Sequence, residues 1–187
     1  MPDHYSIDSM DCRRLDSKNF QKEQIEAREN IVSMKPATND IRVREYTIDD
    51  RETVLNLLRL NTPHYFSPEE EKYLVHYLDH EIEFYYVIEV ERQIVGCGGI
   101  NVFEEENLAR ISWDFLHPEF QGKGLGTKLL EHRIEKIQSM KHIKTIIVRT
   151  SQMAYKFYEK SDFQLTELVK NYWAEGFDLY KMEYTKL

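Results

Sequence analysis

The sequence predicts an α+β domain with a mixed, mostly antiparallel central sheet flanked by helices. The elements are expected in the order strand, two helices, three strands, helix, strand, helix and two strands. This order is not the regular strand–helix alternation that builds a parallel sheet. A short polar turn at residues 91–93 joins two of the strands, as in an antiparallel hairpin. The 187 residues, 41% of them hydrophobic, suffice for one such domain with a core and a short extension.

The spacing of hydrophobic residues predicts the positions of the first strand and the first helix of the domain. Residues 41–46 alternate apolar and polar side chains, as a half-buried strand does. Thr47 can cap the helix that follows. The apolar side of this helix is expected to carry Val54, Leu57, Leu58 and Leu60.

A second helix is expected to start at residue 67. Ser67 can serve as the cap, Pro68 suits the first helical position and Glu70 completes a capping box. This helix carries Tyr73, Leu74, Tyr77 and Leu78. The remaining elements are expected as strands at 84–90, 94–103 and 109–116, a helix at 124–140 with Leu125, Leu129, Ile134 and Ile137 buried, a strand at 144–150, a helix at 153–160, and strands at 165–172 and 179–184.

Residues 1–38 differ from the domain, which is expected over residues 39–187. They are polar, carry charges of both signs and can form a helix at 16–34. Pro36 disfavours helix at the residue before it, so residues 35–39 are interpreted as a linker. Two interpretations stay open: an exposed extension, or an arm that packs on a partner subunit in a homodimer.

Composition excludes several classes of protein. A net charge of -8 makes nucleic acid a poor partner and favours a cationic or amine substrate. Cys12 and Cys97 are too few and too distant for a disulfide framework or a metal pattern, which indicates a reducing cytoplasm. The chain lacks a signal peptide and an apolar run of roughly 20 residues, so neither secretion nor a membrane is expected.

A glycine-rich loop between a strand and a long helix carries the chemistry. Residues 117–127 read His-Pro-Glu-Phe-Gln-Gly-Lys-Gly-Leu-Gly-Thr. Its three glycines expose backbone N–H groups, and the following helix adds unpaired donors and the positive end of its dipole. The loop therefore predicts a phosphate or pyrophosphate site, with Lys123 adding charge at the rim.

Two nucleotide-binding motifs fit this loop poorly. The P-loop spacing is absent, and the dinucleotide fingerprint fails by one position, because Thr127 stands where the third glycine is required. An NADP-binding oxidoreductase is therefore disfavoured, although it stays open as an alternative.

The loop resembles the signature of the GNAT family of N-acetyltransferases. The matching residues are Gln121-Gly-Lys-Gly-Leu-Gly126 after a His-Pro-Glu-aromatic turn, and a second matching segment runs from Ala154 to Phe163. The resemblance covers residues 41–187. It implies acetyl transfer from acetyl-CoA to a primary amine, small or peptidyl, by direct attack in a ternary complex. Acetyl-CoA would lie in a V-shaped cleft between two splayed central strands. A domain that binds acyl-CoA without catalysis is the other alternative.

The resemblance also implies roles for individual residues. Tyr158 takes the place of the general acid, and the Leu116 N–H can polarise the thioester carbonyl. Asp114 is a candidate base, as are Glu104, Glu105 and Glu106, and the choice between them stays open. The implied cofactor-binding residues are Phe115, Leu116, Gln121, Gly122, Lys123, Gly124, Leu125, Gly126, Thr127, Ser151 and Tyr158. No metal is expected.

Two positions depart from the family pattern, and the acceptor is not specified. Ser151 stands where the family often has Asn, and Asp162 stands where it has Gly. Asp tolerates a left-handed backbone better than most residues do. Candidate pocket residues are His64, Tyr65, Phe66, Tyr85, Tyr86, Trp113 and Trp173, although each alone is more typical of a core.

Overall fold

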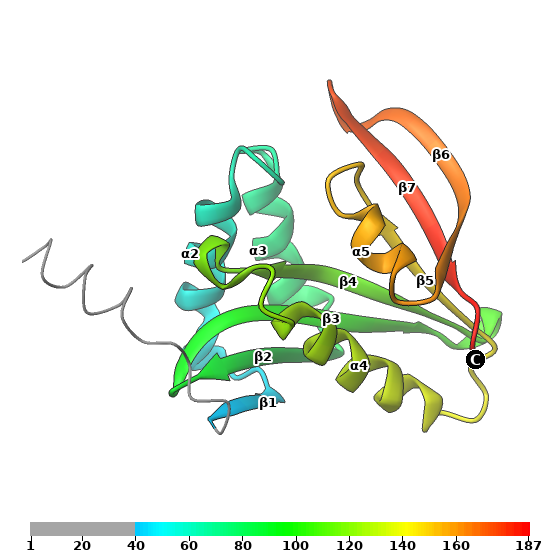
Figure 1. Cartoon of the computed structure of the whole chain (residues 1–187), viewed down its shortest axis with the longest axis horizontal. Coiled ribbons are helices and arrows are strands. Elements are labelled where there is room, and N and C mark those ends of the chain that lie inside the picture. Colours follow the sequence, from blue (N-terminus) through cyan, green and yellow to red (C-terminus); the bar gives the residue numbers. More distant parts are fainter. Residues whose placement is uncertain (1–39) are drawn as a thin grey trace, which may run out of the picture. The chain divides into compact units, whose positions relative to one another are not determined.

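The computed structural model describes residues 40–187 as one seven-stranded sheet with helices on both faces (Figure 1). The strands are β1 Ile41–Glu45, β2 Phe84–Val90, β3 Gln93–Phe103, β4 Leu108–Leu116, β5 Thr145–Thr150, β6 Phe163–Ala174 and β7 Phe177–Tyr184. The helices are α2 Arg51–Asn61, α3 Glu70–His80, α4 Leu125–Gln138 and α5 Tyr155–Glu159, with single 3-10 turns η1 Ile48–Asp50, η2 Glu104–Glu106 and η3 Pro118–Phe120. The predicted fold class and order of elements are confirmed.

The sheet is antiparallel except at its centre. Its strand order is β1-β2-β3-β4-β5-β7-β6, and β4 pairs with β5 in parallel. This pairing extends only from Leu108 opposite Thr145 to Ile111 opposite Val148. Beyond it, β4 continues to Leu116 with no partner in β5. The two central strands therefore splay apart, as the family resemblance implies.

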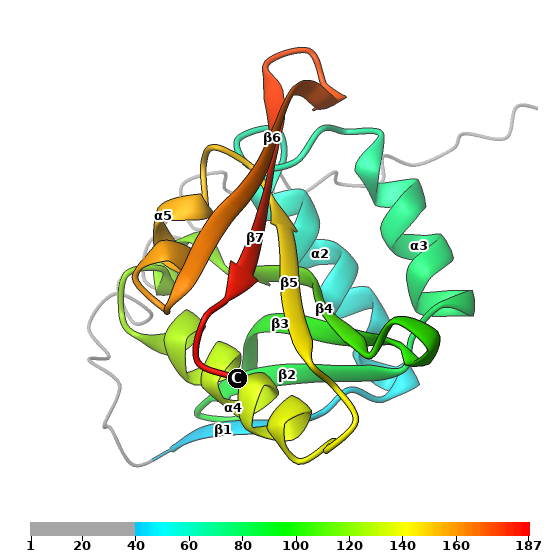
Figure 2. The ribbon, with the colours of Figure 1, turned by 90° about the vertical axis from the view of Figure 1, so that its right-hand side faces the viewer.

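Each face of the sheet has its own core. α4 and α5 cover one face, while α2 and α3 cover the other (Figures 1 and 2). The predicted buried stripe of α4, with Leu125, Leu129, Ile134 and Ile137, is confirmed. On the other face, the prediction that Leu60 lies on the apolar side of α2 is wrong, because it is 54% exposed, and Tyr73 of α3 is 57% exposed. Both lie off the helix faces that bury Leu57 and Leu74.

The two early helices begin a few residues later than predicted. Thr47 caps the short turn η1 rather than α2, and Asp50 accepts a hydrogen bond from the Thr47 N–H at 2.8 Å. α3 begins at Glu70, whose carboxylate accepts from the Ser67 N–H at 2.7 Å. The predicted partners Ser67 and Glu70 therefore meet, in a turn that leads into α3. Thr47 and Asp50 form the turn η1 ahead of α2.

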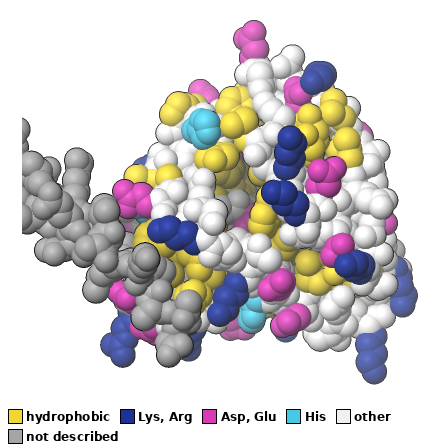
Figure 3. All heavy atoms as spheres, in the orientation of Figure 1, with side chains coloured by type: hydrophobic (Ala, Val, Ile, Leu, Met, Phe, Trp, Pro, Cys, Tyr) yellow, Lys and Arg dark blue, Asp and Glu magenta, His cyan; other side chains and the backbone are white. Residues whose placement is uncertain are grey.

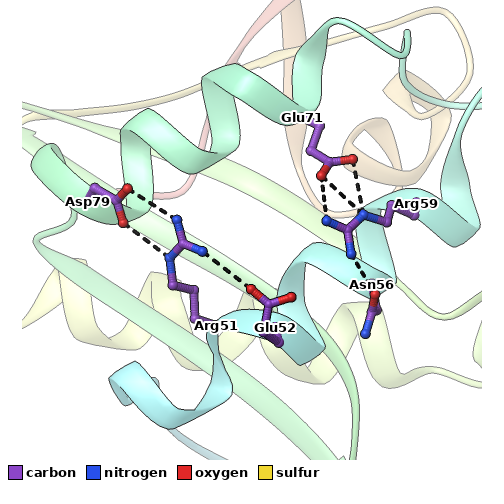
Figure 4. A network of polar contacts seen from close by, with 6 residues as sticks. All are labelled: Arg51, Glu52, Asn56, Arg59, Glu71 and Asp79. Carbon is purple, nitrogen blue, oxygen red and sulfur yellow. Dashed lines mark hydrogen bonds and ion pairs between the residues drawn. The ribbon is translucent and has the colours of Figure 1, made fainter.

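Two ion pairs join α2 to α3 on their outer side (Figure 4). Arg51 donates to Asp79 through Nε at 3.2 Å and Nη2 at 3.1 Å. Arg59, three residues after Asn56 in α2, forms a similar pair of hydrogen bonds with Glu71. Exposed pairs contribute little individually and are screened by salt. Their geometry nevertheless aligns the two helices that wall the cleft described below.

The expected extension over residues 1–38, together with its candidate helix and linker, lies outside the described residues. Among the described helices, none is long and apolar enough to cross a bilayer.

Candidate functional site

A β-bulge in β4 decides which way its last side chains point. Cys97 pairs with Phe115 and Gly99 pairs with Ser112, so Trp113 and Asp114 together face the single residue between them on β3. Trp113 has a φ of 48°, an uncommon conformation for a residue with a side chain. An extra residue in a strand reverses its alternation. Trp113 therefore packs on the α2–α3 face, and Asp114 turns toward α4.

Asp114 lies at the centre of a buried polar cluster. Its Oδ2 accepts a hydrogen bond from Tyr158 Oη at 2.8 Å and an ion-paired one from Arg133 Nη2 at 2.6 Å. The Arg133 side chain is fully buried and also donates from Nε to the Leu129 carbonyl at 3.0 Å. Gly98 leaves room for it, since a Cβ there would lie 2.5 Å from Arg133 Nη1. We call Tyr158, Asp114 and Arg133 the relay cluster.

Burial and charge set the protonation of the relay cluster. Burial raises the pKa of Tyr158 well above 10, and the Asp114 carboxylate raises it further. Burial alone would lower the pKa of Arg133, but Asp114 outweighs it and the pKa is raised. The phenol is therefore protonated and the guanidinium charged at neutral pH.

The glycine loop presents its amides without protein partners. Gly122 and Gly124 have φ values of 71° and 80°, which glycine adopts without strain. In the described part of the chain, no backbone N–H from residue 122 to residue 127 donates a hydrogen bond. The Lys128 N–H, bonded to the Gly124 carbonyl at 3.1 Å, is the first engaged donor of α4. Such a row of free donors at a helix N-terminus suits a phosphate or pyrophosphate.

Two amide side chains tie this loop to the end of β4. Asn61 Nδ2 donates to the Leu116 carbonyl at 2.9 Å, and Gln121 Nε2 donates to Asn61 Oδ1 at 3.1 Å. Tyr65 Oη donates to Gln121 Oε1 at 3.1 Å. The His117 N–H bonds the Val95 carbonyl of β3 at 2.8 Å. Because backbone groups alternate along a strand, the Leu116 N–H faces the other edge, where β5 has diverged.

The loop and two members of the relay cluster, Tyr158 and Asp114, open into one cleft of about 650 Å³. Figure 3 shows this face hollowed between the α2–α3 part and the α5–β6–β7 part, with hydrophobic side chains in the hollow. The predicted site residues that line it are Asp114, Phe115, Leu116, Gln121, Gly122, Gly124, Gly126, Thr127, Ser151 and Tyr158. Most of the predicted site residues thus lie around one cleft, although they come from four separate segments of the chain.

Two predicted cofactor residues do not line the cleft. The Leu125 side chain is buried in the core, so only its N–H is available. Lys123 Nζ lies 4.8 Å from the centre of the Phe120 ring rather than over the loop. Asp162 has a φ of 66°, which confirms the left-handed conformation expected where the family has glycine.

The structure changes the set of candidates for the general base. Glu104, Glu105 and Glu106 lie exposed in η2 before β4 begins, and none lines the cleft. Glu70 does line it, and burial raises the pKa of its carboxyl. The sequence predicts only a capping role for Glu70, because helix spacing does not reveal that its side chain faces a cleft.

The aromatic residues divide between pocket and core. Tyr65, Phe66, Trp113 and Trp173 line the cleft. Tyr85 and Tyr86 are buried in the core, and His64 is exposed outside the cleft.

Three further polar residues of the site were missed in the sequence. Asn61 and Arg133 lie within helices, and Arg110 lies in a strand. Arg133 did carry a signal, since it stands four residues after Leu129 on the apolar stripe of α4. A charged residue on such a stripe indicates a buried partner.

Comparison with known proteins agrees with this geometry. The model of the Acetyltransferase (GNAT) family matches residues 51–163. The chain belongs to the GNAT family. The matched region contains the glycine loop and the whole relay cluster, so both lie within the part that the family shares.

Two amino-acid acetyltransferases are similar to part of this GNAT chain. An amino-acid acetyltransferase of Pseudomonas fluorescens (strain Pf0-1) is 30% identical over 123 residues, which are 63% of this chain and 26% of the relative. That of Pasteurella multocida is 28% identical over 130 residues, covering 67% of this chain and 28% of its own. The chain thus spans about a quarter of the length of these relatives.

Solved structures show the same GNAT fold. The ribosomal-protein-S18-alanine N-acetyltransferase from Escherichia coli aligns with a TM-score of 0.64 and 17% identity, over 77% of this chain and 92% of that one. The PaiA N-acetyltransferase from Thermoplasma acidophilum, in complex with coenzyme A, aligns with a TM-score of 0.61 and 18% identity, over 78% and 98%.

Proposed function

We propose that this chain transfers an acetyl group from acetyl-CoA to a primary amine, small or peptidyl, by direct attack in a ternary complex. One observation carries the proposal: the unpaired amides of residues 122–127 and the phenol of Tyr158 open into the same cleft. The amides are suited to binding a pyrophosphate, and the phenol is suited to donating a hydrogen bond to the departing thiolate. Membership of the GNAT family supports both assignments.

The residues present fit acetyl-CoA. Amides from Gly122 to Thr127 and the N-terminus of α4 would hold the pyrophosphate. Phe115 and Leu116 border the splayed edge of β4, where the pantetheine arm would lie, and Ser151 lies on the opposite wall. When bound, acetyl-CoA supplies an activated acyl group as a thioester, and no metal is part of this proposal.

Leu116 and Tyr158 would act on the reacting atoms. The Leu116 N–H would donate to the oxyanion that develops on the carbonyl oxygen, an interaction worth about 10²–10³ in rate. Tyr158 would donate its proton toward the departing sulfur. Because its pKa lies above that of a thiol, roughly 8.5, complete transfer is uphill. Its main effect is therefore a hydrogen bond that stabilises the thiolate.

Asp114 and Arg133 would position this phenol. Asp114 Oδ2 accepts from both the Tyr158 phenol and the buried Arg133 guanidinium, so this carboxylate links the two groups. We therefore assign proton removal from the amine to Glu70, directly or through water. Its raised pKa makes it a stronger base than an exposed carboxylate.

The wider setting is part of the same proposal. Residues 39–187 would form the acetyltransferase domain, and residues 1–38 an extension that contacts solvent or a second copy in a homodimer. The two distant cysteines support a cytoplasmic protein. The net charge of -8 supports the absence of a nucleic-acid partner, and no membrane partner is part of this proposal.

A melting experiment with acetyl-CoA, CoA and NADPH side by side tests this function. Acetyl-CoA at 100 times its Kd is expected to add about 2.7 kcal/mol of stability. Release of CoA is then measured with a panel of amines. Stabilisation by NADPH alone would favour the oxidoreductase, and stabilisation by acetyl-CoA without CoA release would favour a silent binding domain.

Replacing Gly124 by Ala is expected to weaken acetyl-CoA binding about tenfold. A Cβ there meets open space, but a φ of 80° strains any L side chain, by about 1–2 kcal/mol. The loop would relax and turn its amides away from the pyrophosphate. Calorimetric titration with acetyl-CoA measures the change. Gly176→Ala is the matched control, since Gly176 has a φ of 81° in the β6–β7 turn. Equal effects of the two substitutions on binding would contradict the role of the loop.

A further inference from the structure

Two arginines stand side by side at the point where the central strands part. Arg110 on β4 pairs with Ile147 on β5, and Arg149 follows two residues later. Because side chains alternate along a strand, both arginines project from the same face, the one covered by α3. Both are half-buried and both line the cleft. Burial and the nearby Arg149 charge lower the pKa of Arg110, which reflects their proximity.

No described carboxylate forms an ion pair with either arginine. The nearest acidic residues to Arg110 have other partners. Glu83 accepts from Asn101 Nδ2 at 3.3 Å and from the Val102 N–H at 3.0 Å. Glu81 contacts His76 at 3.3 Å. Two like charges thus face one cleft without an ion-pair partner among the described residues, although the Glu81 and Glu83 charges act on Arg110 and favour its charged form.

The surroundings of Arg149 leave its hydrogen-bond donors available. Its guanidinium carbon lies 4.9 Å from the centre of the Tyr172 ring and 5.2 Å from that of Trp173. Stacking of this kind uses the flat face of the guanidinium. The N–H groups at its edge remain free for the paired hydrogen bonds that a carboxylate accepts.

A third polar group lies in the same wall. Tyr77 lines the cleft, is 2% exposed, and its hydroxyl has no hydrogen-bond partner among the described residues. An unpaired buried hydroxyl is unfavourable. The Arg110 charge also acts on it, opposing the rise in the pKa of Tyr77 that burial causes. The cleft therefore offers an anion two guanidinium groups, and Tyr77 lies in the same wall.

We infer that Arg110 and Arg149 bind a carboxylate of the acceptor, so that the acceptor is a small primary amine of the amino-acid class. This inference rests on the proposed function. Arg110, Arg149 and Tyr158 line one cleft, at the point where β4 and β5 part. A small acceptor whose carboxylate is held by the two arginines therefore has its amine in the same cleft as Tyr158.

Matched acceptors test the inference on the intact chain. Glutamate, aspartate and other amino acids are compared with their amides, with spermidine and with phosphoethanolamine, by CoA release and by calorimetry on the CoA-loaded protein. Carboxylate-bearing amines are expected to have kcat/KM at least about tenfold above their amides, since a charge-assisted pair is lost in the amide. Preference for amides, spermidine or phosphoethanolamine, or no carboxylate binding, would overturn it.

The variants Arg149→Gln and Arg110→Gln test whether these two arginines cause the preference for carboxylate-bearing acceptors. Each is expected to raise KM for the carboxylate acceptor about ten- to one-hundredfold and KM for its amide less than about threefold. Stabilisation by acetyl-CoA should not change, which separates this result from failure of the proposed function. Arg42→Gln, at an exposed arginine on β1, is the control. Equal KM changes for the carboxylate and amide acceptors would refute the assignment.

Discussion

Replacing Tyr158 by Phe is expected to lower kcat about 100-fold or more, as loss of a donor to developing negative charge does, with little change in acetyl-CoA affinity. The variant keeps the ring that packs against Phe163 and removes only the hydroxyl bonded to Asp114. The departing thiolate then loses its hydrogen-bond donor. Steady-state CoA release gives kcat, and a melt with acetyl-CoA gives binding.

Tyr155→Phe is the matched control for that variant. Tyr155 lies in the same helix, stacks on Tyr180 with ring centres 4.6 Å apart and does not line the cleft. Because burial holds the pKa of Tyr158 well above 10, wild-type kcat should not fall through this group at any pH below about 10. Undiminished turnover in the Phe variant would remove Tyr158 from the mechanism.

Replacing Arg133 by Met is expected to cost about 3 kcal/mol of folding stability, the lower part of the range for a broken buried ion pair. The lower part applies because the Asp114 side chain is 12% exposed at the cleft. The loss corresponds to a fall in Tm of roughly 6–12 °C for a domain of this size. Thermal or urea unfolding measures it.

A positioning role for Arg133 predicts an additional kinetic effect. Without the guanidinium, the Asp114 carboxylate loses one of the two groups bonded to its Oδ2 and holds the Tyr158 phenol less firmly. kcat of the variant should therefore fall, while acetyl-CoA binding changes little. The double variant Arg133→Met with Asp114→Asn should regain stability, since no unpaired carboxylate remains. A single variant as stable as wild type would contradict the buried ion pair.

The fold was predictable because its signals are local. The alternation at Ile41 to Glu45 and the stripe of α4 each follow from the period of one element. The incorrect expectations concern side chains whose burial depends on the neighbouring element. Tyr73 satisfied the apolar pattern of α3, yet the helix buries its Leu74 side and leaves Tyr73 exposed.

The free amides of the glycine loop were predictable from the sequence alone, because glycines before a helix expose amides whatever surrounds them. The side chains that face this loop were not predictable in this way, because they come from distant segments. The bulge at Trp113 turned Asp114 toward Arg133, and the early end of β4–β5 pairing brought Arg110 and Arg149 to a common cleft. Side-chain direction after a bulge and contact between distant segments depend on pairing across strands, which no single stretch of sequence contains.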